Sequence, residues 1–341
     1  MHKRATITDV AEKSGFSVAT VSRCFAGNGY PVSEEAAKKI QAAALELEYT
    51  PNVVGRMLKT NTSRDIGVII PTIRNPFYPD VLLGIEKAAA GRGYQILLCN
   101  SLRDRDTESR YISSLYQKQV RGIILASADN KISYEPIAEK GMHFVNLESD
   151  EGCGFCRGID FNYRQGGSLM AAHLRSLGHE RIAFVTSPLT KKSRVDILTG
   201  IRSIYGENVS IIIDDTEKED ETGNYEYQMG MRTANVLFGN GRNITGIIAV
   251  NDMTGAGIIR ALQNMGIDVP GQVSVAGFDN IDLSSMITPS LTTIDQPGFE
   301  TGRLAAEMLI DLIEGNEIKN TRLEPRLIVR ASTGKAGGYN D

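Results

Sequence analysis

Residues 6–25 have the types and the spacing of a surface that contacts a nucleic acid rather than one that performs catalysis. Thr8 or Asp9 is expected to cap a short helix, and Glu12 follows Asp9 by three residues, as in a capping box. Gly15 is expected to end this helix, because glycine tolerates the left-handed conformation of a tight turn. A second helix directly after such a turn would complete a helix-turn-helix.

The second helix is expected to begin after Ser17, whose side chain can cap it, and to turn Val18 and Val21 inward. A helix presented in this way fits the major groove of DNA. Two amphipathic helices joined by a turn also occur in other helical proteins, so the segment alone leaves that interpretation open. A third helical pattern, from Ser33 to Leu47, favours a compact three-helix DNA-binding domain.

The charge distribution agrees with contact to DNA at one end of the chain. Residues 1–64 contain nine Lys or Arg and six Asp or Glu, which gives this segment a net charge of +3. The whole chain has a net charge of −4, so residues 65–341 carry −7. A basic end on an acidic body suits a protein that holds phosphates with one part only.

The composition describes a folded protein of two or three domains. The chain has 341 residues, of which 41% are hydrophobic and 23% charged, so it has enough apolar residues for a buried core. Four cysteines do not suggest a disulfide framework, and residues 1–20 lack the apolar run of a signal peptide. Since no stretch approaches the roughly 20 apolar residues of a membrane span, we expect a cytoplasmic protein without membrane contact.

Motifs for enzymatic or metal chemistry are weak. Cys153 and Cys156 form a lone Cys-x-x-Cys pair, which favours two ordinary thiols over a redox pair and lacks the second pair of a zinc site. The four histidines have no metal-ligand spacing, and no nucleophile elbow, phosphate loop or dinucleotide fingerprint occurs. We therefore expect no metal, no cofactor and no enzymatic activity. An α/β enzyme and a pure solute-binding protein are the alternatives that the fold class leaves open.

From residue 65 onward, short apolar runs alternate with amphipathic helical patterns. This alternation predicts parallel sheets covered by helices on both faces. It extends over about 230 residues, which is long for one doubly wound sheet, so we divide it near residues 160–163 into two lobes. Ligands usually bind between such lobes, at the carboxyl ends of the strands. The expected strands are residues 66–70, 95–99, 122–126, 143–147, 181–186, 210–213, 246–250 and 273–276; the expected helices include 78–92, 105–118, 165–177, 226–238 and 253–265, and residues 301–314 and 327–329 return to complete the lobes.

Residues 51–60 connect the three-helix segment to this body. Gly55 weakens any helix there, so the residues themselves favour a linker. The alternative is a hinge helix that folds only against DNA and places Leu58 as an apolar wedge in the minor groove.

Motifs along almost the whole chain resemble those of the lactose/galactose repressor (LacI/GalR) family of bacterial transcription regulators. They occur in the expected order and spacing. The motifs are TDVA at 8–11, VATVSR at 18–23, YTPN at 49–52, RML at 56–58, IGVIIP at 66–71, NPFY at 75–78, GIE at 84–86, QVRG at 119–122, GH at 178–179, ND at 251–252, VAGFDN at 275–280 and LTTIDQP at 291–297.

The resemblance implies an all-α helix-turn-helix headpiece plus hinge helix, followed by a two-lobed α/β core like that of periplasmic sugar-binding proteins. It implies a repressor that binds a palindromic operator in double-stranded DNA as a homodimer, because the two-fold axis of the dimer matches the palindrome. The implied limits are a headpiece at 1–50, a hinge helix or linker at 51–63 and a core at 64–341, with an N-lobe at about 64–161 and 296–325 and a C-lobe at about 162–295 and 326–341.

For the DNA contact, the resemblance favours the hinge helix over the plain linker. Arg23 is the strongest candidate for direct readout, because arginine can donate two hydrogen bonds to guanine. Leu58 would intercalate from the hinge. The implied DNA-binding residues are Thr8, Ser17, Val18, Ala19, Thr20, Ser22, Arg23, Asn52, Arg56 and Leu58.

For the effector, the resemblance implies a small molecule, a sugar or related metabolite, in the cleft between the lobes. It would shift the relative angle of the lobes and so change operator affinity. The implied contacts are Phe77, Tyr78, Asn146, Asp160, Ile197, Asp252 and Asp279.

The chain departs from the family pattern at two of these positions. Asn146 stands where an Asp is often found at the end of the fourth strand. Ile197 stands where the family usually has an effector-gripping arginine, and Arg194 is out of register by three residues. A nucleoside, a sugar phosphate, a protein co-effector or no effector therefore stays open. Asp252 could equally cap a helix, and Phe77 and Tyr78 could serve packing rather than stacking against a ring.

Overall fold

The structure, a computed structural model, describes residues 5–26, 32–50, 63–126, 134–147, 157–216, 224–239 and 244–337. The chain forms two compact units, Met1–Ser63 and Arg64–Asp341. The expected hinge helix and the pair Cys153 and Cys156 lie outside the described residues. Within the described ranges, every helix is too short or too polar to cross a membrane.

The first unit contains α1 (Ile7–Ser14), α2 (Val18–Ala26) and α3 (Glu34–Glu46). Thr6, and not Thr8 or Asp9, caps α1: its hydroxyl accepts a hydrogen bond from the Asp9 amide, and the Asp9 carboxylate accepts one from the Thr6 amide at 2.7 Å. The capping box therefore starts earlier than expected, because Asp9 is the acid that returns to the cap. Gly15 ends α1 with a left-handed φ of 75°.

The helices of the first unit pack around Val10, Val21 and Ile40, which are fully buried. Lys13 and Glu46 join α1 to α3 through an ion pair of 2.6 Å. The expected caps of the other two helices are present, since the Thr20 amide donates to the Ser17 hydroxyl and the Ala36 amide to the Ser33 hydroxyl. Short helices of this kind depend on such caps and on tertiary packing for their stability.

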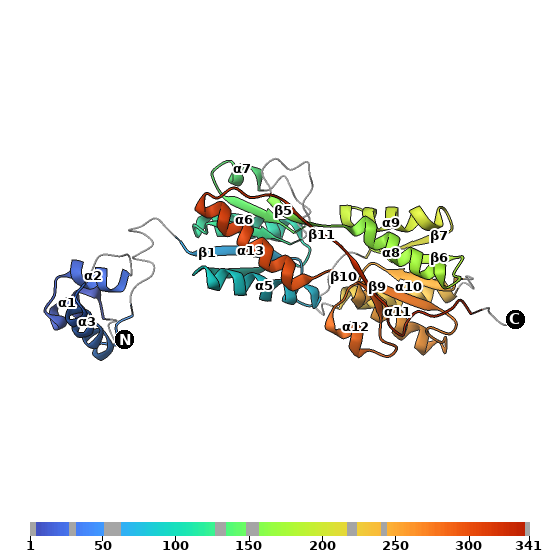
Figure 1. Cartoon of the computed structure of the whole chain (residues 1–341), viewed down its shortest axis with the longest axis horizontal. Helices are drawn as coiled ribbons and strands as arrows, with labels where there is room; N and C mark the ends of the chain where they lie inside the picture. Colours follow the sequence, from blue (N-terminus) through green and yellow to red (C-terminus); the bar gives the residue numbers. More distant parts are fainter. Residues whose placement is uncertain are drawn as a thin grey trace. The chain divides into compact units, whose positions relative to one another are not determined.

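The second unit contains two six-stranded sheets, and we call the parts built on them the first and second lobes (Figure 1). The first sheet has the strand order β11-β5-β4-β3-β1-β2, with every neighbouring pair parallel. Its elements are β1 (Asp65–Ile70), α5 (Phe77–Gly91), β2 (Gln95–Asn100), α6 (Arg105–Gln117), β3 (Gly122–Leu125), α7 (Glu135–Ala138), β4 (His143–Asn146), β5 (Arg157–Phe161), α13 (Gly298–Glu314) and β11 (Thr321–Leu323).

The second sheet has the strand order β12-β10-β9-β8-β6-β7, in which only the described pair β10 and β12 is antiparallel. Its elements are α8 (Tyr163–Ser176), β6 (Ile182–Thr186), α9 (Lys192–Tyr205), β7 (Val209–Ile213), α10 (Tyr225–Gly239), β8 (Gly246–Ala249), α11 (Asp252–Asn264), β9 (Ser274–Asp279), α12 (Asp282–Met286), β10 (Thr292–Asp295) and β12 (Arg326–Ile328).

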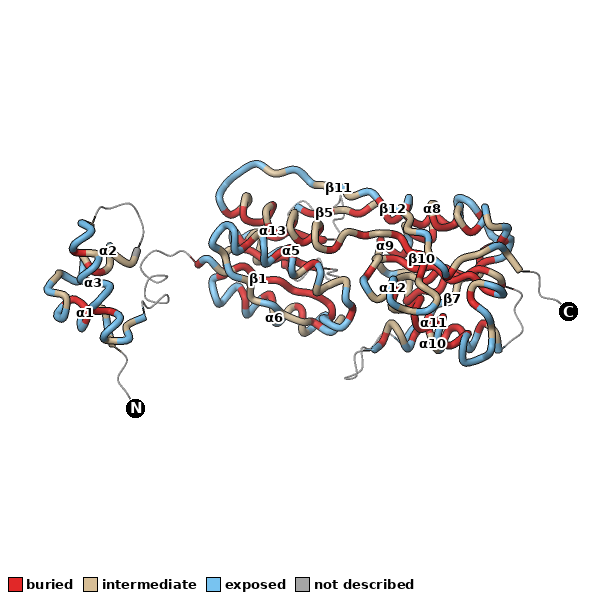
Figure 2. Tube along the Cα trace, turned by 60° about the horizontal axis from the view of Figure 1, so that its bottom comes forward, coloured by how far each residue is buried: buried red, intermediate tan, exposed pale blue. Residues whose placement is uncertain are grey.

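Helices cover both faces of each sheet, so inner strands such as β1, β3, β6 and β8 are almost continuously buried, whereas the edge strands β2 and β7 are partly exposed (Figure 2). On β1, Val68 packs with α5 and α13, whereas the next residue, Ile69, packs with α6 on the opposite face. The second sheet alternates in the same way between α8 with α9 and α10 with α11. This alternation follows from the two-residue period of a strand.

Glycines let several helix pairs approach closely. A Cβ on Gly302 of α13 would lie 1.9 Å from the carbonyl oxygen of Val81 in α5. A Cβ on Gly200 of α9 would lie 2.0 Å from the carbonyl oxygen of Arg164 in α8. Only glycine fits at these crossings without a backbone shift. Gly200 therefore fixes how closely α9 packs against α8.

The chain passes between the lobes three times, and side chains on these crossovers are hydrogen bonded to one another. Asn162 follows β5, and its side-chain amide donates to Glu324, which lies between β11 and β12, at 2.8 Å. Arg322 donates to the Asn162 side-chain oxygen at 2.9 Å. The Gln296 amide, after β10, donates to the Tyr163 hydroxyl at 3.0 Å. The three crossovers therefore form one connected hinge region.

The two-sheet core and the three-helix segment confirm the predicted fold class. The sequence prediction did not include the strands β5 and β10 or the helix α9. It also ended the strand around Val275 at Ala276, whereas β9 continues to Asp279. This extension matters because it carries Asp279 to the edge where a ligand would bind.

Candidate nucleic-acid interface and ligand cavity

The outward side of α2 offers small and polar side chains with one arginine, and we call it the recognition face. Ser17, Ala19 and Arg23 are exposed, and Val18 is 42% exposed. The helix has no acidic residue in its first turn. A capped helix beginning with small side chains and without a carboxylate can approach a phosphate backbone and reach base edges.

The exposure of Val18 corrects the prediction that it points inward. The hydrophobic cluster around Val10 and Ile40 includes Val21 but not Val18, which lies in the first turn of α2. Val18 is thus available for apolar contact, for example with a thymine methyl group.

Of the remaining predicted DNA contacts of the first unit, Thr20 and Ser22 belong to α2 and Thr8 belongs to α1. Thr8 is exposed, whereas Thr20 and Ser22 are half-buried. The Ser17 and Thr20 hydroxyls are 2.9 Å apart, and the Arg23 Nε donates to the Ala19 carbonyl at 3.2 Å. Asn52, Arg56 and Leu58 lie outside the described residues.

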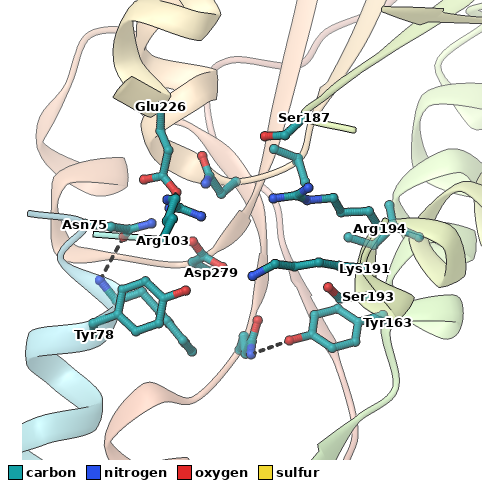
Figure 3. Close-up of a pocket in the computed structure, with 15 residues that line it drawn as sticks. Asn75, Tyr78, Arg103, Tyr163, Ser187, Lys191, Ser193, Arg194, Glu226 and Asp279 are labelled. Carbon is teal, nitrogen blue, oxygen red and sulfur yellow. Dashed lines mark hydrogen bonds and ion pairs between the residues drawn. The ribbon is translucent and has the colours of Figure 1, made fainter. Parts of the chain in front are cut away.

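A cavity of about 80 Å³ lies between the two lobes of the second unit (Figure 3). A single buried water needs roughly 10–15 Å³, so this space accommodates a small polar molecule. Most of its lining is polar or charged. The lining residues are Asn75, Phe77, Tyr78, Arg103, Tyr163, Ser187, Lys191, Ser193, Arg194, Ile197, Glu226, Val250, Asn251, Asp279 and Gln296.

The wall on the first lobe is built by the start of α5. The Asn75 side-chain oxygen accepts a hydrogen bond from the Phe77 amide at 3.0 Å, which fixes the turn before the helix. The rings of Phe77 and Tyr78 meet edge to face, with centroids 5.4 Å apart. This wall therefore combines aromatic surface with the Asn75 amide.

The wall on the second lobe is built by the start of α9. Lys191 is the N-cap residue of this helix, and Ser193 and Arg194 belong to its first turn. Arg194 is only 8% exposed, and its Nη1 donates to the Pro188 carbonyl at 2.6 Å. In Figure 3 the Lys191 and Arg194 side chains extend into the cavity on the side facing Asp279.

An ion pair joins the two lobes at the edge of the cavity. Arg103 follows β2 in the first lobe, and its Nη2 lies 2.6 Å from a carboxylate oxygen of Glu226 in α10 of the second lobe. The two side chains are 17% and 12% exposed. Arg103 also lies over the Tyr225 ring, and burial raises the pKa of that tyrosine. Because both side chains are largely shielded from water, this pair links the two lobes more strongly than an exposed pair would.

Asp279 lines the cavity from the end of β9 with an unusual backbone. Its φ is 112°, and Asn280 after it has a φ of 57°. Non-glycine residues seldom adopt positive φ, and such residues cluster at functional sites. The strained turn places the Asp279 carboxylate in the cavity.

Four of the seven predicted effector contacts line the cavity: Phe77, Tyr78, Ile197 and Asp279. Asn146, a buried residue at the end of β4, is not part of this lining. Asp160 does not line it either, since its carboxylate faces Arg322 of β11 at 3.6 Å in the hinge region. Burial raises the pKa of Asp160.

Asp252 is also turned away from the cavity. Its carboxylate accepts hydrogen bonds from the Thr293 hydroxyl at 2.5 Å and from the Ile281 amide at 3.0 Å, and it is almost fully buried. This burial raises the pKa of Asp252. The preceding residue, Asn251, caps α11 and lines the cavity instead.

Arg194 is the most important cavity residue that the sequence prediction set aside. It precedes Ile197 by three residues, and both lie on α9 and line the cavity. Residues three apart share one face of a helix, so the shift in register moves the guanidinium by a turn and keeps it on the same side. Recognising that a helix begins at Lys192 would have revealed this. Among the described residues, no cluster of His, Cys, Asp and Glu could hold a metal ion.

Comparison with known proteins matches both units. Residues 6–52 match the family described as bacterial regulatory proteins, lacI family, and residues 171–333 match a periplasmic binding protein-like domain. The ribose operon repressor of Escherichia coli K12 is 33% identical over 337 residues, covering 96% of this chain and 99% of that protein. The transcriptional repressor PurR of Photobacterium profundum is 30% identical. The match covers 96% of this chain and 98% of that protein.

Solved structures agree with this assignment. The lac repressor dimer bound to operator has a TM-score of 0.85 at 25% identity, covering 97% of this chain and all of that one. A LacI-family regulator from Enterococcus faecium with bound ribose has a TM-score of 0.70 at 29% identity. The match covers 80% of this chain and 99% of that one.

The helix-turn-helix unit and the two-sheet core together define a DNA-binding transcription regulator. The chain belongs to the LacI family of bacterial regulatory proteins. Members of this family such as the ribose operon repressor are transcription repressors rather than enzymes.

Proposed function

We propose that the chain represses transcription by binding a palindromic operator as a homodimer, and that a small sugar-derived effector in the cavity controls this binding. It acts in the cytoplasm, where operator DNA is found. We assign the headpiece to residues 1–50, the hinge to 51–63 and the core to 64–341. The lobes of the core are assigned to 64–161 with 296–325 and to 162–295 with 326–341.

The recognition face supports the DNA-binding role. Ser17, Val18, Ala19 and Arg23 are exposed on a helix without acidic residues in its first turn. Arg23 supplies direct readout through two hydrogen bonds to a guanine, while the hydroxyl groups at the start of α2 position the helix on phosphates. A homodimer presents two such faces to the two halves of a palindrome.

The observation that carries the effector role is the cavity between the lobes, bridged at its edge by Arg103 and Glu226. A ligand that contacts both the α5 wall and the α9 wall favours one relative angle of the lobes. The chain leaves the headpiece and enters β1 of the first lobe at Asp65, so a change in this angle can reach the DNA-binding part. A ligand acts on operator affinity only as far as it binds the two arrangements differently.

The experiment is selection of a binding site from random DNA followed by fluorescence anisotropy with the full chain. The expected result is a two-fold symmetric site whose affinity falls steeply as salt rises, because phosphate neutralisation releases counterions. Arg23→Met should weaken this site by about 10- to 100-fold, since a bidentate arginine–guanine contact is worth about 1–3 kcal/mol.

The matched control is Lys39→Gln, which also removes one positive charge from the headpiece. Lys39 is exposed on α3, not on α2, and is paired with Glu35. It should change affinity by less than about threefold. Failure to enrich any symmetric site, or equal losses in both variants, would contradict the proposed DNA contact.

A further inference from the structure

We infer that Asp252 and Arg330 are positioning residues of the effector site, which hold the turn after β9 in the conformation that places the Asp279 carboxylate in the cavity. This inference rests on the proposed function and concerns how its effector site is kept in shape. Both positioning residues are outside the cavity lining. It gives Asp252, which the sequence analysis placed in contact with the effector, an indirect role.

The turn after β9 has a backbone that needs support from its surroundings. Asp279 has a φ of 112° and Asn280 a φ of 57°. Asparagine tolerates the left-handed region near 57°, whereas the φ of Asp279 lies beyond it. Such a conformation persists only where neighbouring groups enforce it. Because the Asp279 side chain lines the cavity (Figure 3), the groups that contact this turn decide where its carboxylate lies.

Asp252 holds the turn from the start of α11, where it is 1% exposed. One of its carboxylate oxygens accepts a hydrogen bond from the Ile281 amide at 3.0 Å, and the other accepts one from the Thr293 hydroxyl at 2.5 Å. The same hydroxyl accepts a hydrogen bond from the Asn280 amide at 3.3 Å. Asp252 therefore fixes two successive backbone amides of the turn, one directly and one through Thr293.

The strand before the turn leaves room for this carboxylate. A Cβ at Gly277 of β9 would lie 2.3 Å from a carboxylate oxygen of Asp252. The carboxylate thus packs directly against the strand two residues before Asp279. Its hydrogen bonds are directed to the backbone of the turn and to the neighbouring strand β10, so it acts on the cavity through Asp279.

Arg330 holds the turn from the segment after β12. Its Nη2 donates to the Asn280 side-chain oxygen at 2.6 Å, and its Nη1 donates to the Leu291 carbonyl at 2.8 Å and to the Ser284 hydroxyl at 3.0 Å. The Asn280 side-chain nitrogen donates to Asp295 at 2.8 Å. A planar guanidinium with several donors suits a group that joins separate segments. Both polar ends of the Asn280 side chain are therefore fixed.

A positioning role predicts a different result from a purely stabilising one. If Asp252 only stabilised its lobe, its loss would lower ligand affinity whether or not Asp279 is present. If Asp252 acts through Asp279, its loss has no further effect once the Asp279 carboxylate has been removed. The coupling between the two substitutions therefore separates the two roles.

The test is isothermal titration of the full chain with D-ribose as the probe, in a double-mutant cycle at pH 7.5. Asp252→Ala and Asp279→Ala should each weaken binding by about tenfold or more, because each removes or displaces a charged acceptor of hydroxyl groups. The double variant should bind within about threefold of Asp279→Ala alone. Losses that multiply in the double variant would overturn the inference.

Two further variants control for the charge and for the stability of the lobe. Asp252→Asn should bind D-ribose within about threefold of wild type, because its amide can still accept from Ile281 and donate to Thr293. Asp214→Ala is the matched control. Asp214 is buried in the same lobe, lies 2.7 Å from Arg232 and is outside the cavity lining. It should lower the melting temperature and leave D-ribose affinity within about threefold; a loss as large as that of Asp252→Ala would overturn the inference.

Arg330→Gln serves as a second, independent variant, and it replaces Asp252→Ala in the cycle if circular dichroism shows that protein to be unfolded. Arg330 is only partly buried, and its loss should show the same coupling to Asp279.

Hydrogen exchange of the ligand-free protein gives a result that does not depend on the effector. In both positioning variants the Asn280 and Ile281 amides should exchange faster than in wild type, whereas the amides of β8 should keep their rates. Unchanged exchange at these two amides would overturn the inference. Absence of D-ribose binding by the wild-type protein contradicts the sugar effector of the proposed function, and the exchange rates then decide the positioning role by themselves.

Discussion

The recognition face and the cavity are both built at the beginnings of helices, and they differ in how deeply their side chains are buried. Val18 on the recognition face is 42% exposed, whereas Arg194 in the cavity is 8% exposed. The face belongs to one short helix, α2. The cavity needs α5, α8, α9, α10, the residue before α11 and the crossover that contains Gln296. The first surface can therefore be altered without loss of the fold, and the second depends on the packing of the whole core.

The largest effect should come from the glycine that places α9. A Cβ at Gly200 would lie 2.0 Å from the Arg164 carbonyl oxygen, so Gly200→Ala forces α8 and α9 apart. We expect the free energy of unfolding of the core to fall by about 3 kcal/mol. Gly91→Ala, where a Cβ meets nothing within 4 Å, is the matched control and should not destabilise the core.

Hydrogen exchange checks that prediction region by region. In Gly200→Ala, amides of α8 and α9 should exchange faster, whereas those of α1, α2 and α3 should keep their wild-type rates. Faster exchange throughout the first unit would show that the two regions are not independent. The comparison between them would then fail.

A smaller effect is expected for the coupling free energy of ion pairs, which should be larger for a shielded pair than for an exposed one. A double-mutant cycle with Arg103→Gln and Glu226→Gln should give a coupling free energy of about 1–2 kcal/mol for urea unfolding of the core, because both side chains are largely buried. The headpiece pair Glu35 and Lys39 is 81% and 61% exposed, and its cycle should give less than about 0.5 kcal/mol. Equal coupling in the two cycles would contradict the shielding of Arg103 and Glu226 from water.

The smallest expected effect is a loss of core stability as the pH falls. Burial lowers the pKa of His143, His173 and His179, all in the core. The unfolded chain therefore binds more protons than the folded core once the pH falls below about 6.5, and stability is lost from there toward the lowered folded-state pKa. Urea unfolding at pH 7.5 and 5.5 should show this loss, and His173→Gln should make it smaller. A loss of the same size in the variant would exclude this histidine as a source.

The same contrast explains which features could be predicted from the sequence. The caps, Gly15 and the small residues of α2 follow each other within about twenty residues, so local patterns identify the helix-turn-helix. The parallel sheets were also predictable, because buried strands such as β1 are continuous apolar runs. In the capping box, the sequence offered two acids at suitable spacing, and only the structure shows that Asp9 is used.

The cavity was predicted only in part, because its residues come together through long-range packing. Arg103 and Glu226 are 123 residues apart in sequence, and nothing in either segment alone indicates their ion pair. Asp252 lies just after an expected strand, and Asp160 lies at the expected boundary between the lobes, but both carboxylates have partners within the protein. Arg194 was set aside because it is three residues out of register with the family pattern. The beginning of α9, which would have placed Arg194 and Ile197 on one face, was not predicted, since its first turn has neither an acidic residue nor a capping side chain.

The most direct test of the account is the operator affinity of the full chain, measured by anisotropy with and without a small ligand that saturates the cavity. The account predicts that saturating ligand changes the wild-type dissociation constant by about fivefold or more, as expected for allosteric coupling. In Asp279→Ala the same ligand concentration should have a smaller effect on an otherwise normal operator affinity. A wild-type operator affinity that stays constant while the cavity is saturated would contradict the account.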